Sequence, residues 1–180
     1  MRFVALACSV TLLAACEKAV ENNQQAAANK AGDASEVAST TVAAAAAKPL
    51  TKEAALKLMH DRHENMEEIG DAVKAARRQI NAASPDVGEI RRSAATIARL
   101  APHVPSWFPA GTGPDVGKTE ALPAIWEKPQ DFAARARDFQ KAALAFDAAA
   151  KSGDLARVKT SFGDLGKTCK SCHDPYREEH

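Results

Sequence analysis

The sequence predicts an all-α protein, an antiparallel four-helix bundle, and three observations favour this fold class. Alanine dominates the composition, and β-branched residues are few. Apolar residues recur at alternating steps of three and four, which is the period of an amphipathic helix, and no segment alternates with the period of two typical of strands. The roughly 130 residues of 49–180 suffice for one domain. Two short joints and one long crossing loop between the periodic segments complete the pattern of a bundle.

Capping residues delimit the first two predicted helices. The first begins near Thr51, whose side chain can cap a helix, and ends around Ala83. Ser84 and Pro85 predict the start of the second, with Ser84 as the cap and Pro85 at the first helical position. This second helix stops before Pro102, because a proline cannot continue it. Their apolar stripes comprise Ala55, Leu58, Met59, Arg62, Met66, Ile69, Val73, Ala76 and Ile80, and then Val87, Ile90, Ala94, Ile97 and Leu100.

Residues 102–129 form a long connection that is rich in proline and glycine, so the sequence predicts no regular structure there. A third helix starts at about Gln130, and Ser152 and Gly153 end it. Asp154 is then the expected cap of a fourth helix. Apolar residues of this last helix share one seam: Leu155, Val158, Phe162, Leu165, Cys169, Cys172 and Tyr176.

Two cysteines and a histidine near the end of the chain form its most specific chemical motif. Cys169 and Cys172 lie one turn apart on the same face of the predicted helix, and His173 follows at once. The C-x-x-C-H pattern is typical of covalent c-type haem attachment, in which both thiols bond the macrocycle and the histidine ligates the iron. The apolar seam runs through both cysteines, so we expect one haem c in the bundle core near the C-terminal helix.

Three other interpretations of these cysteines stay open at this point. A thioredoxin-like dithiol normally begins a helix in a βαβ setting, whereas this motif ends a helical pattern. A zinc site needs further ligands, and the two other cysteines, Cys8 and Cys16, lie in the N-terminal leader. A structural disulfide between Cys169 and Cys172 would leave His173 unexplained.

The N-terminus resembles an export signal. Residues 1–15 combine a positive start at Arg2 with a short apolar run, which predicts a signal peptide. Residues 13–16, Leu-Ala-Ala-Cys, resemble the lipobox of bacterial lipoproteins, in which the cut falls before a cysteine that is then lipidated. Cys16 is therefore the expected lipid anchor on the periplasmic side of a bacterial membrane. An ordinary signal followed by a soluble periplasmic protein is the alternative.

Composition and charge indicate the organisation of the remaining residues and limit the classes of partner. Residues 16–48 are rich in small and polar types and predict a flexible tether before the domain of residues 49–180. As a coil, roughly 30 residues reach on the order of 30 Å. The chain has 24 basic and 23 acidic residues. This balance, without a basic run, argues against a nucleic-acid partner.

With the haem motif at the very end of a four-helix pattern, the chain resembles the cytochrome c′ family, the class II c-type cytochromes. Residues 169–177 match its C-terminal C-x-x-C-H-x-x-[YF]-R pattern, and residues 162–166 resemble the segment before it. Residues 122–126 contain the Pro-x-Ile-Trp that leads into the third helix. Residues 62–66, followed by Gly70, resemble the first-helix pattern R-x-x-x-[ML]-x-x-x-G.

The resemblance implies a role for each matching residue. Cys169 and Cys172 would bond the haem, and His173 would be the proximal ligand of the iron. Arg177 would lie beside the proximal side, and Arg62 would pair with a propionate. Met66 would face the distal side, and with Gly70 it looks most like the low-spin cytochrome c-556 branch, in which a methionine is the sixth ligand.

These implied roles lead to an expected function. We expect an exported monohaem cytochrome that carries single electrons between periplasmic redox proteins and catalyses no reaction. A five-coordinate cytochrome c′-like protein that binds nitric oxide or carbon monoxide is the alternative, and a structural or sensory haem lipoprotein is a third. Met59 and His63 are weaker rivals of Met66 as ligand, and Met66 as an ordinary core residue also stays open. A homodimer through the first two helices, as in the family, is left open too.

Overall fold

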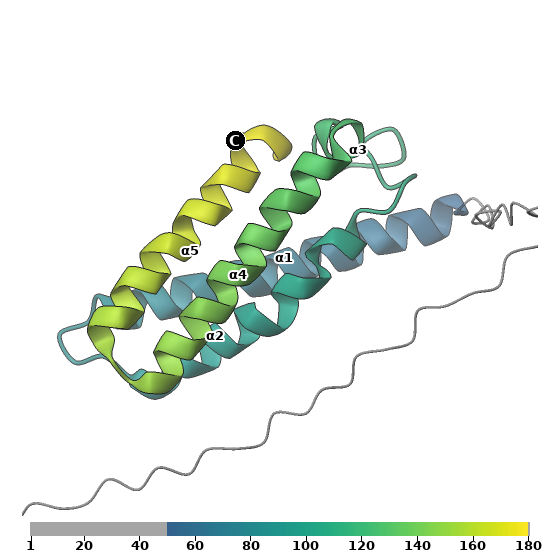
Figure 1. Cartoon of the computed structure of the whole chain (residues 1–180). Helices are drawn as coiled ribbons and strands as arrows, with labels where there is room; N and C mark the ends of the chain where they lie inside the picture. The colour runs from purple at the N-terminus through teal and green to yellow at the C-terminus, as the bar shows by residue number, and fades with distance from the viewer. Residues whose placement is uncertain (1–49, 180) are drawn as a thin grey trace, which may run out of the picture. The chain divides into compact units, whose positions relative to one another are not determined.

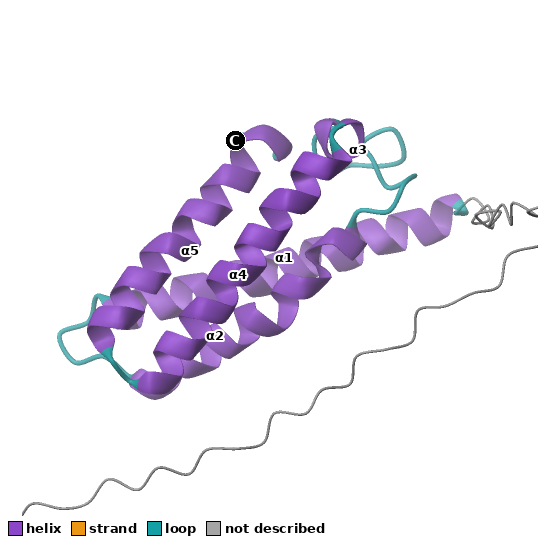
Figure 2. Cartoon of the chain, in the orientation of Figure 1, coloured by secondary structure: helices purple, strands orange, loops and turns teal. Residues whose placement is uncertain are grey.

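A computed structural model describes residues 50–179 of the chain. The signal peptide predicted for 1–15, the anchor Cys16 and the tether of 16–48 lie outside these residues. Helices dominate the described part, whose only bridge between extended residues joins Ala121 to Arg177 (Figures 1 and 2). In chain order the elements are α1 (Lys52–Ile80), α2 (Val87–Leu100), the 3₁₀ helix η1 (Ala101–Trp107), α3 (Ala124–Glu127), α4 (Pro129–Ser152) and α5 (Leu155–Tyr176).

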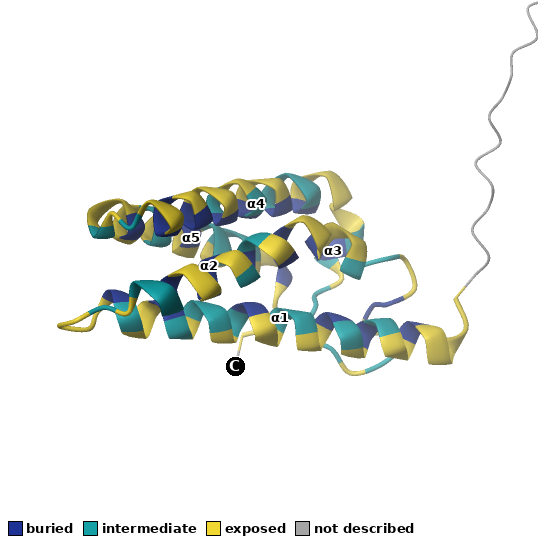
Figure 3. Ribbon diagram, turned by 90° about the horizontal axis from the view of Figure 1, so that it is seen from below, coloured by how far each residue is buried: buried dark blue, intermediate teal, exposed yellow. Residues whose placement is uncertain are grey.

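The four long helices pack as the predicted antiparallel bundle. Neighbours in sequence pair closely, α1 with α2 and α4 with α5, and α2 packs on α4 between these pairs. Helices α1 and α5 touch only sparsely, so this side is the least closed of the bundle. Every long helix turns its buried residues inward and its exposed residues outward (Figure 3). The predicted fold class is therefore confirmed.

Side-chain caps set the ends of the helices. Thr51 caps α1 by accepting a hydrogen bond from the amide of Ala54 (3.2 Å), as expected. The predicted cap Ser84 is wrong: Asp86 caps α2 by accepting from the amide of Glu89 (3.1 Å). Asp86 directly precedes the first helical residue, while Ser84 lies in the turn after α1, which ends at Ile80 rather than Ala83.

The joint between α4 and α5 follows the sequence prediction. Gly153 has a φ of 75°, in the left-handed region that favours glycine, and it ends α4. The carboxylate of Asp154 then accepts from the amides of Ala156 (2.9 Å) and Arg157 (3.1 Å). This cap fixes the residue at which α5 begins. It therefore helps to determine which side of the helix Cys169 and Cys172 face.

The connection between α2 and α4 is more ordered than the sequence predicted. It contains η1 and the short α3, so the expectation of no regular structure in residues 102–129 is wrong in part. Pro102 and Pro105 are compatible with η1 because the fixed φ of proline suits a short helical turn. The indole N–H of Trp126 donates to the carbonyls of Phe108 and Pro109 (both 3.1 Å), which ties α3 back to the end of η1.

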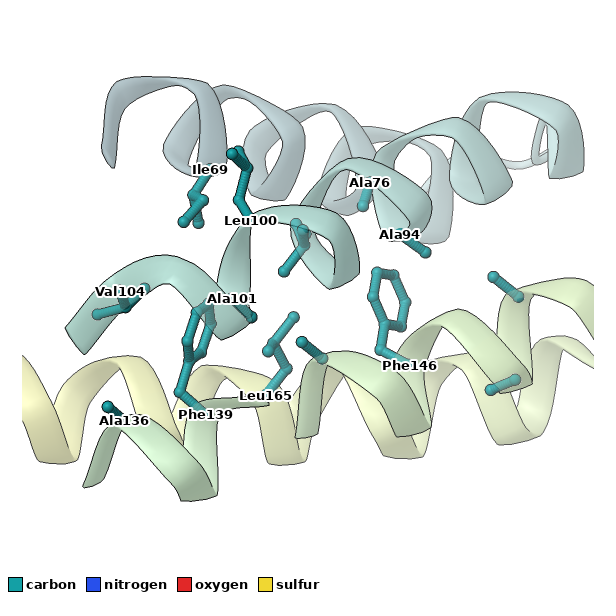
Figure 4. Packing of buried hydrophobic residues seen from close by; sticks show 14 of the residues in the cluster. Ile69, Ala76, Ala94, Leu100, Ala101, Val104, Ala136, Phe139, Phe146 and Leu165 are labelled. Carbon is teal, nitrogen blue, oxygen red and sulfur yellow. The ribbon is translucent and has the colours of Figure 1, made fainter. Parts of the chain in front are cut away.

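The core runs the length of the bundle between α2, α4 and α5, with one face of α1 closing it. Phe146 of α4 and Leu165 of α5 are fully enclosed, as are Ile90 and Ile97 of α2. Figure 4 shows Phe139 and Phe146 of α4 reaching toward Ala101 and Ala94. Small alanines opposite large rings let the helices interlock, which is the usual way to fill a helical core without voids.

Candidate haem site

The C-x-x-C-H motif lies in the last two turns of α5. Cys169 and Cys172 are half-buried free thiols, and both pack against the hydrophobic core. His173 is the next residue of the helix and is exposed. The two sulfurs therefore sit on the core side of one helical face, as covalent attachment to a single macrocycle requires. A helix end is also not the setting of a thioredoxin-like dithiol, which begins a helix.

The local environment favours neutral forms of all three side chains. Burial raises the pKa of the Cys169 thiol, and burial likewise raises that of Cys172. Desolvation by the surrounding chain lowers the pKa of His173, and the nearby positive charge of Arg177 lowers it further. A neutral imidazole is the form that ligates a metal, so the direction of this pKa shift is compatible with His173 as a ligand.

Partly exposed apolar side chains of α1 and α5 offer surface that a large flat apolar group can cover. Met66 and Val73 of α1 and Phe162 of α5 pack against the same core as the two cysteines, yet each keeps part of its surface exposed. They belong to α1 and α5, which contact each other far less than α1 contacts α2 or α4 contacts α5. A macrocycle held by Cys169 and Cys172 would cover this apolar surface, which favours its binding through the hydrophobic effect.

Arg62, for which a propionate was the expected partner, is tied to the long connection. It is only 5% exposed, and its two terminal nitrogens donate to the carbonyl of Thr112 (3.2 and 3.1 Å). One of them also donates to the hydroxyl of Thr112 (3.2 Å), and the other to that of Thr119 (3.0 Å). Its guanidinium lies 4.7 Å from the ring centre of Phe108. Arg62 therefore fastens α1 to the connection, and the pairing with a propionate stays a prediction.

This anchoring role leads to a first mutational prediction. Replacing Arg62 with methionine keeps the length of the side chain but removes its donors, and it leaves the buried Thr112 carbonyl without these partners. We expect the free energy of unfolding to fall by about 2–3 kcal/mol, the usual scale for hydrogen bonds to a charged group. Denaturant unfolding of the mature protein measures this change. Arg78→Met on the exposed side of α1 is the matched control, and equal losses in both variants would contradict the role.

Arg177 lies one turn after His173 and is fixed from two sides. Its backbone N–H donates to the carbonyl of His173 (2.9 Å), and its side chain forms an ion pair with Glu120 (2.7 Å). The flanking backbone adds two bonds: Leu122 N–H donates to the Tyr176 carbonyl (3.0 Å), and Glu178 N–H donates to that of Glu120 (2.8 Å). The structure thus holds Arg177 next to His173, and its place beside the proximal side of a haem stays a prediction.

The candidate axial ligands on α1 differ in their surroundings. Met66 is half-buried against the core. Met59, seven residues earlier, is 6% exposed and packs near Gly117 of the connection, at the opposite end of the helix from the α1–α2 joint. His63 is exposed and lies 3.5 Å from Glu67, as expected for a surface residue. The arrangement thus favours Met66 among the three.

Several residues of the site were not found from the sequence. Glu120, Thr112 and Thr119 lie in the connection, where no periodicity distinguishes one polar residue from another. Arg135 of α4 was also missed, although its guanidinium donates to the carbonyl of Ser171 inside the haem motif (2.7 Å). Each acts through a partner more than 30 positions away in the sequence, so spacing gave no signal for it.

A four-helix bundle with a C-terminal C-x-x-C-H motif defines a class II, monohaem c-type cytochrome. The sequence pattern of the family described as "Cytochrome C'" matches residues 57–177, and the chain belongs to this family. Covalently attached haem c is the cofactor of the family, as the motif predicted. Within the described residues, no helix is long and apolar enough to span a bilayer.

Individual relatives agree with this assignment. The chain is 35% identical over 117 residues to cytochrome c′ of Pararhodospirillum photometricum, covering 65% of this chain and 93% of that one. It is 37% identical to cytochrome c-556 of Agrobacterium tumefaciens, covering 62% and 89%. The solved cytochrome c′ of Thermochromatium tepidum superposes with a TM-score of 0.65 at 26% identity, over 73% of this chain and all of that one. Another matching structure is a nitric oxide complex of a mutant of cytochrome c prime from Alcaligenes xylosoxidans (TM-score 0.63, 26% identity, 73% of this chain and all of that one).

Proposed function

We propose that this cytochrome is an exported single-electron carrier whose iron is ligated by His173 and Met66, and that it performs no substrate chemistry. The observation that carries the proposal is the position of Met66. It lies on the face of α1 that packs against the same core as Cys169 and Cys172, and it remains half-buried there. The thioether of Met66 lies on α1, which together with α5 would enclose the haem.

The surroundings of Met66 suit a ligand on a rigid support. Arg62, one turn earlier, clamps α1 to the connection, and Ile69, almost one turn later, is buried in the core. Bound haem supplies the one-electron couple, and an axial methionine raises its reduction potential. The protein would hold the side chains of His173 and Met66 on packed helices. The two side chains would then move little when the iron gains or loses an electron.

A second candidate function is the binding of a small gas at an open distal position. It is favoured by the matched structure of a mutant of a related cytochrome c prime, which is a nitric oxide complex. In this alternative Met66 is a core residue that does not reach the iron, because methionine also fills gaps between helices. The two functions differ in the coordination number of the ferrous iron, which a visible spectrum reports.

Met66→Ala is the variant that separates the two functions. If Met66 is a ligand, its removal changes low-spin iron to high-spin iron and lets the ferrous protein bind carbon monoxide readily. Absorption spectra of the oxidised and reduced protein, with and without carbon monoxide, measure this change.

The buried Met59 of the same helix offers a matched control, since Met59→Ala also removes a thioether from α1. We expect Met59→Ala to keep the parental spin state. A parent protein that is already five-coordinate and reactive toward carbon monoxide, with a spectrum that Met66→Ala leaves unchanged, would replace the electron carrier with the gas-binding function.

The proposed location is the periplasmic side of a bacterial membrane, with Cys16 as the lipid anchor. Proteins of this family are periplasmic, and a solved relative is a dimer whose dissociation is controlled by a ligand. We propose periplasmic redox proteins as partners, with a homodimer as a further assembly. A tether of the predicted length would let the domain meet partners in many orientations while staying near the membrane.

The lipid anchor leads to a direct prediction for Cys16→Ser. Labelled palmitate should be incorporated into the parent protein but not into the variant, and the parent alone should sediment with membranes. Cys8→Ser, inside the apolar run of the leader, is the control and should still be labelled. If the parent takes up no label and stays in the soluble periplasmic fraction, the chain carries an ordinary signal peptide instead.

A further inference from the structure

The last turn of α5 contains a proline, and this breaks the hydrogen-bond pattern of the haem-binding helix. Pro175 has no backbone N–H, and it lies four residues after Ser171. In an α-helix the N–H of residue i donates to the carbonyl of residue i−4, so the Ser171 carbonyl loses its normal donor. Ser171 lies between the two cysteines, and its carbonyl belongs to the peptide group that leads into Cys172.

A side chain from the neighbouring helix donates to this carbonyl. Nη1 of Arg135, on α4, lies 2.7 Å from the Ser171 oxygen. Further along α5 the regular pattern resumes, since the N–H of Arg177 donates to the carbonyl of His173 (2.9 Å). The one backbone bond that Pro175 removes is thus replaced by a charged donor from outside the helix.

Arg135 is itself held in place by two partners. Its Nε donates to a carboxylate oxygen of Asp131, one turn earlier on α4 (2.7 Å). The same oxygen accepts from the hydroxyl of Tyr176 (2.5 Å), the buried residue that follows Pro175. The ring of Tyr176 packs edge-on against Phe132 with centroids 5.5 Å apart. Arg135 and Asp131 therefore connect α4 to α5 on both sides of the proline.

We propose that Arg135 is a positioning residue for the proximal ligand: it replaces the donor that Pro175 lacks and so fixes the turn of α5 that carries Cys172 and His173. Without it, the Ser171 carbonyl would be free to tilt away from the helix axis, and the following peptide groups would move with it. The ring of His173 would then change its angle to the iron. This inference rests on haem attachment through His173 and is independent of the identity of the sixth ligand.

A double-mutant cycle between Arg135 and Pro175 tests the inference. The four proteins are the parent, Arg135→Met, Pro175→Ala and the double variant, each matured with haem. Pro175→Ala restores a backbone N–H that can donate to Ser171, so it should make Arg135 dispensable. Two properties are measured. The first is hydrogen exchange of the amides of Asp174, Tyr176 and Arg177, which are present in all four proteins. The second is the ferric electron paramagnetic resonance spectrum, which is sensitive to the orientation of the axial histidine.

In the parent background, Arg135→Met should speed this exchange by about three- to tenfold, the effect of losing a charged donor that is partly solvated. It should also shift the ferric g-values. In the Pro175→Ala background the same substitution should change exchange by less than about twofold and leave the g-values unchanged, because interacting residues give non-additive effects. Arg137→Met, at an exposed position of the same helix, controls for the loss of one positive charge and should match the parent.

Three results would overturn the inference. Arg135→Met could behave as Arg137→Met does in both readouts. It could have equal effects in the two backgrounds, which would mean that Arg135 does not act through the Ser171 carbonyl. Arg135→Met could also fail to mature, and if the double variant fails equally, the restored N–H has not compensated for Arg135. Recovery of maturation in the double variant would support the inference.

Discussion

Replacing Cys169 and Cys172 together with serine is expected to abolish covalent haem attachment. Serine keeps the size and the helical setting of both side chains but has no thiol to bond the macrocycle. The matured parent protein should give a c-type pyridine haemochrome spectrum and keep its colour on a denaturing gel. The double variant should show no haem band on that gel, and any haem it holds should be extracted by acidified organic solvent.

Ser171→Ala is the matched control for this experiment, because it changes a residue between the two cysteines while leaving C-x-x-C-H intact. Its hydroxyl only donates to the carbonyl of Thr168 (3.1 Å). The control should stay red on the gel. Haem that remained bound to the double serine variant after denaturation would mean that other residues attach it.

Truncating Phe146 should have the largest effect on stability. This ring is fully buried at the centre of the core and lies 5.3 Å from the ring of Phe162, centre to centre. Phe146→Ala is expected to lower the free energy of unfolding by about 3–5 kcal/mol, because it removes apolar contacts and leaves a cavity. Guanidinium unfolding of the haem-bound protein measures the loss.

Leu144, two residues earlier on α4, provides the comparison, since it is 51% exposed. Leu144→Ala should cost only a few tenths of a kcal/mol, as substitutions at solvated positions usually do. If both variants lost the same stability, α4 would not face the core as described.

The sequence predicted the helices well because each one carries its own periodic signal. The stripes of α1 and α2 placed Met59, Ile69, Ile90 and Ile97 on buried faces, and these residues are buried. The seam of α5 placed both cysteines against the core, where they lie half-buried. Periodicity of this kind depends only on residues three or four positions apart, so it can be recognised in the sequence before the rest of the fold is known.

The features that the sequence left out depend on contacts between distant segments. The sequence placed Arg62 on the apolar stripe of α1, but it did not indicate that Thr112 and Thr119 would be the hydrogen-bond partners of Arg62. Glu120 gave no signal of its pairing with Arg177. The connection also forms η1 and α3, which pack against the long helices. These tertiary contacts leave no periodic pattern in the sequence of the connection.

Peptide mass spectrometry of the matured, denatured protein is the decisive test of covalent haem attachment at Cys169 and Cys172. The proteolytic peptide spanning Cys169 to His173 should carry the mass of one haem, and neither Cys169 nor Cys172 should react with an alkylating reagent. The same peptide at its bare mass, with Cys169 and Cys172 both alkylated, would contradict this attachment.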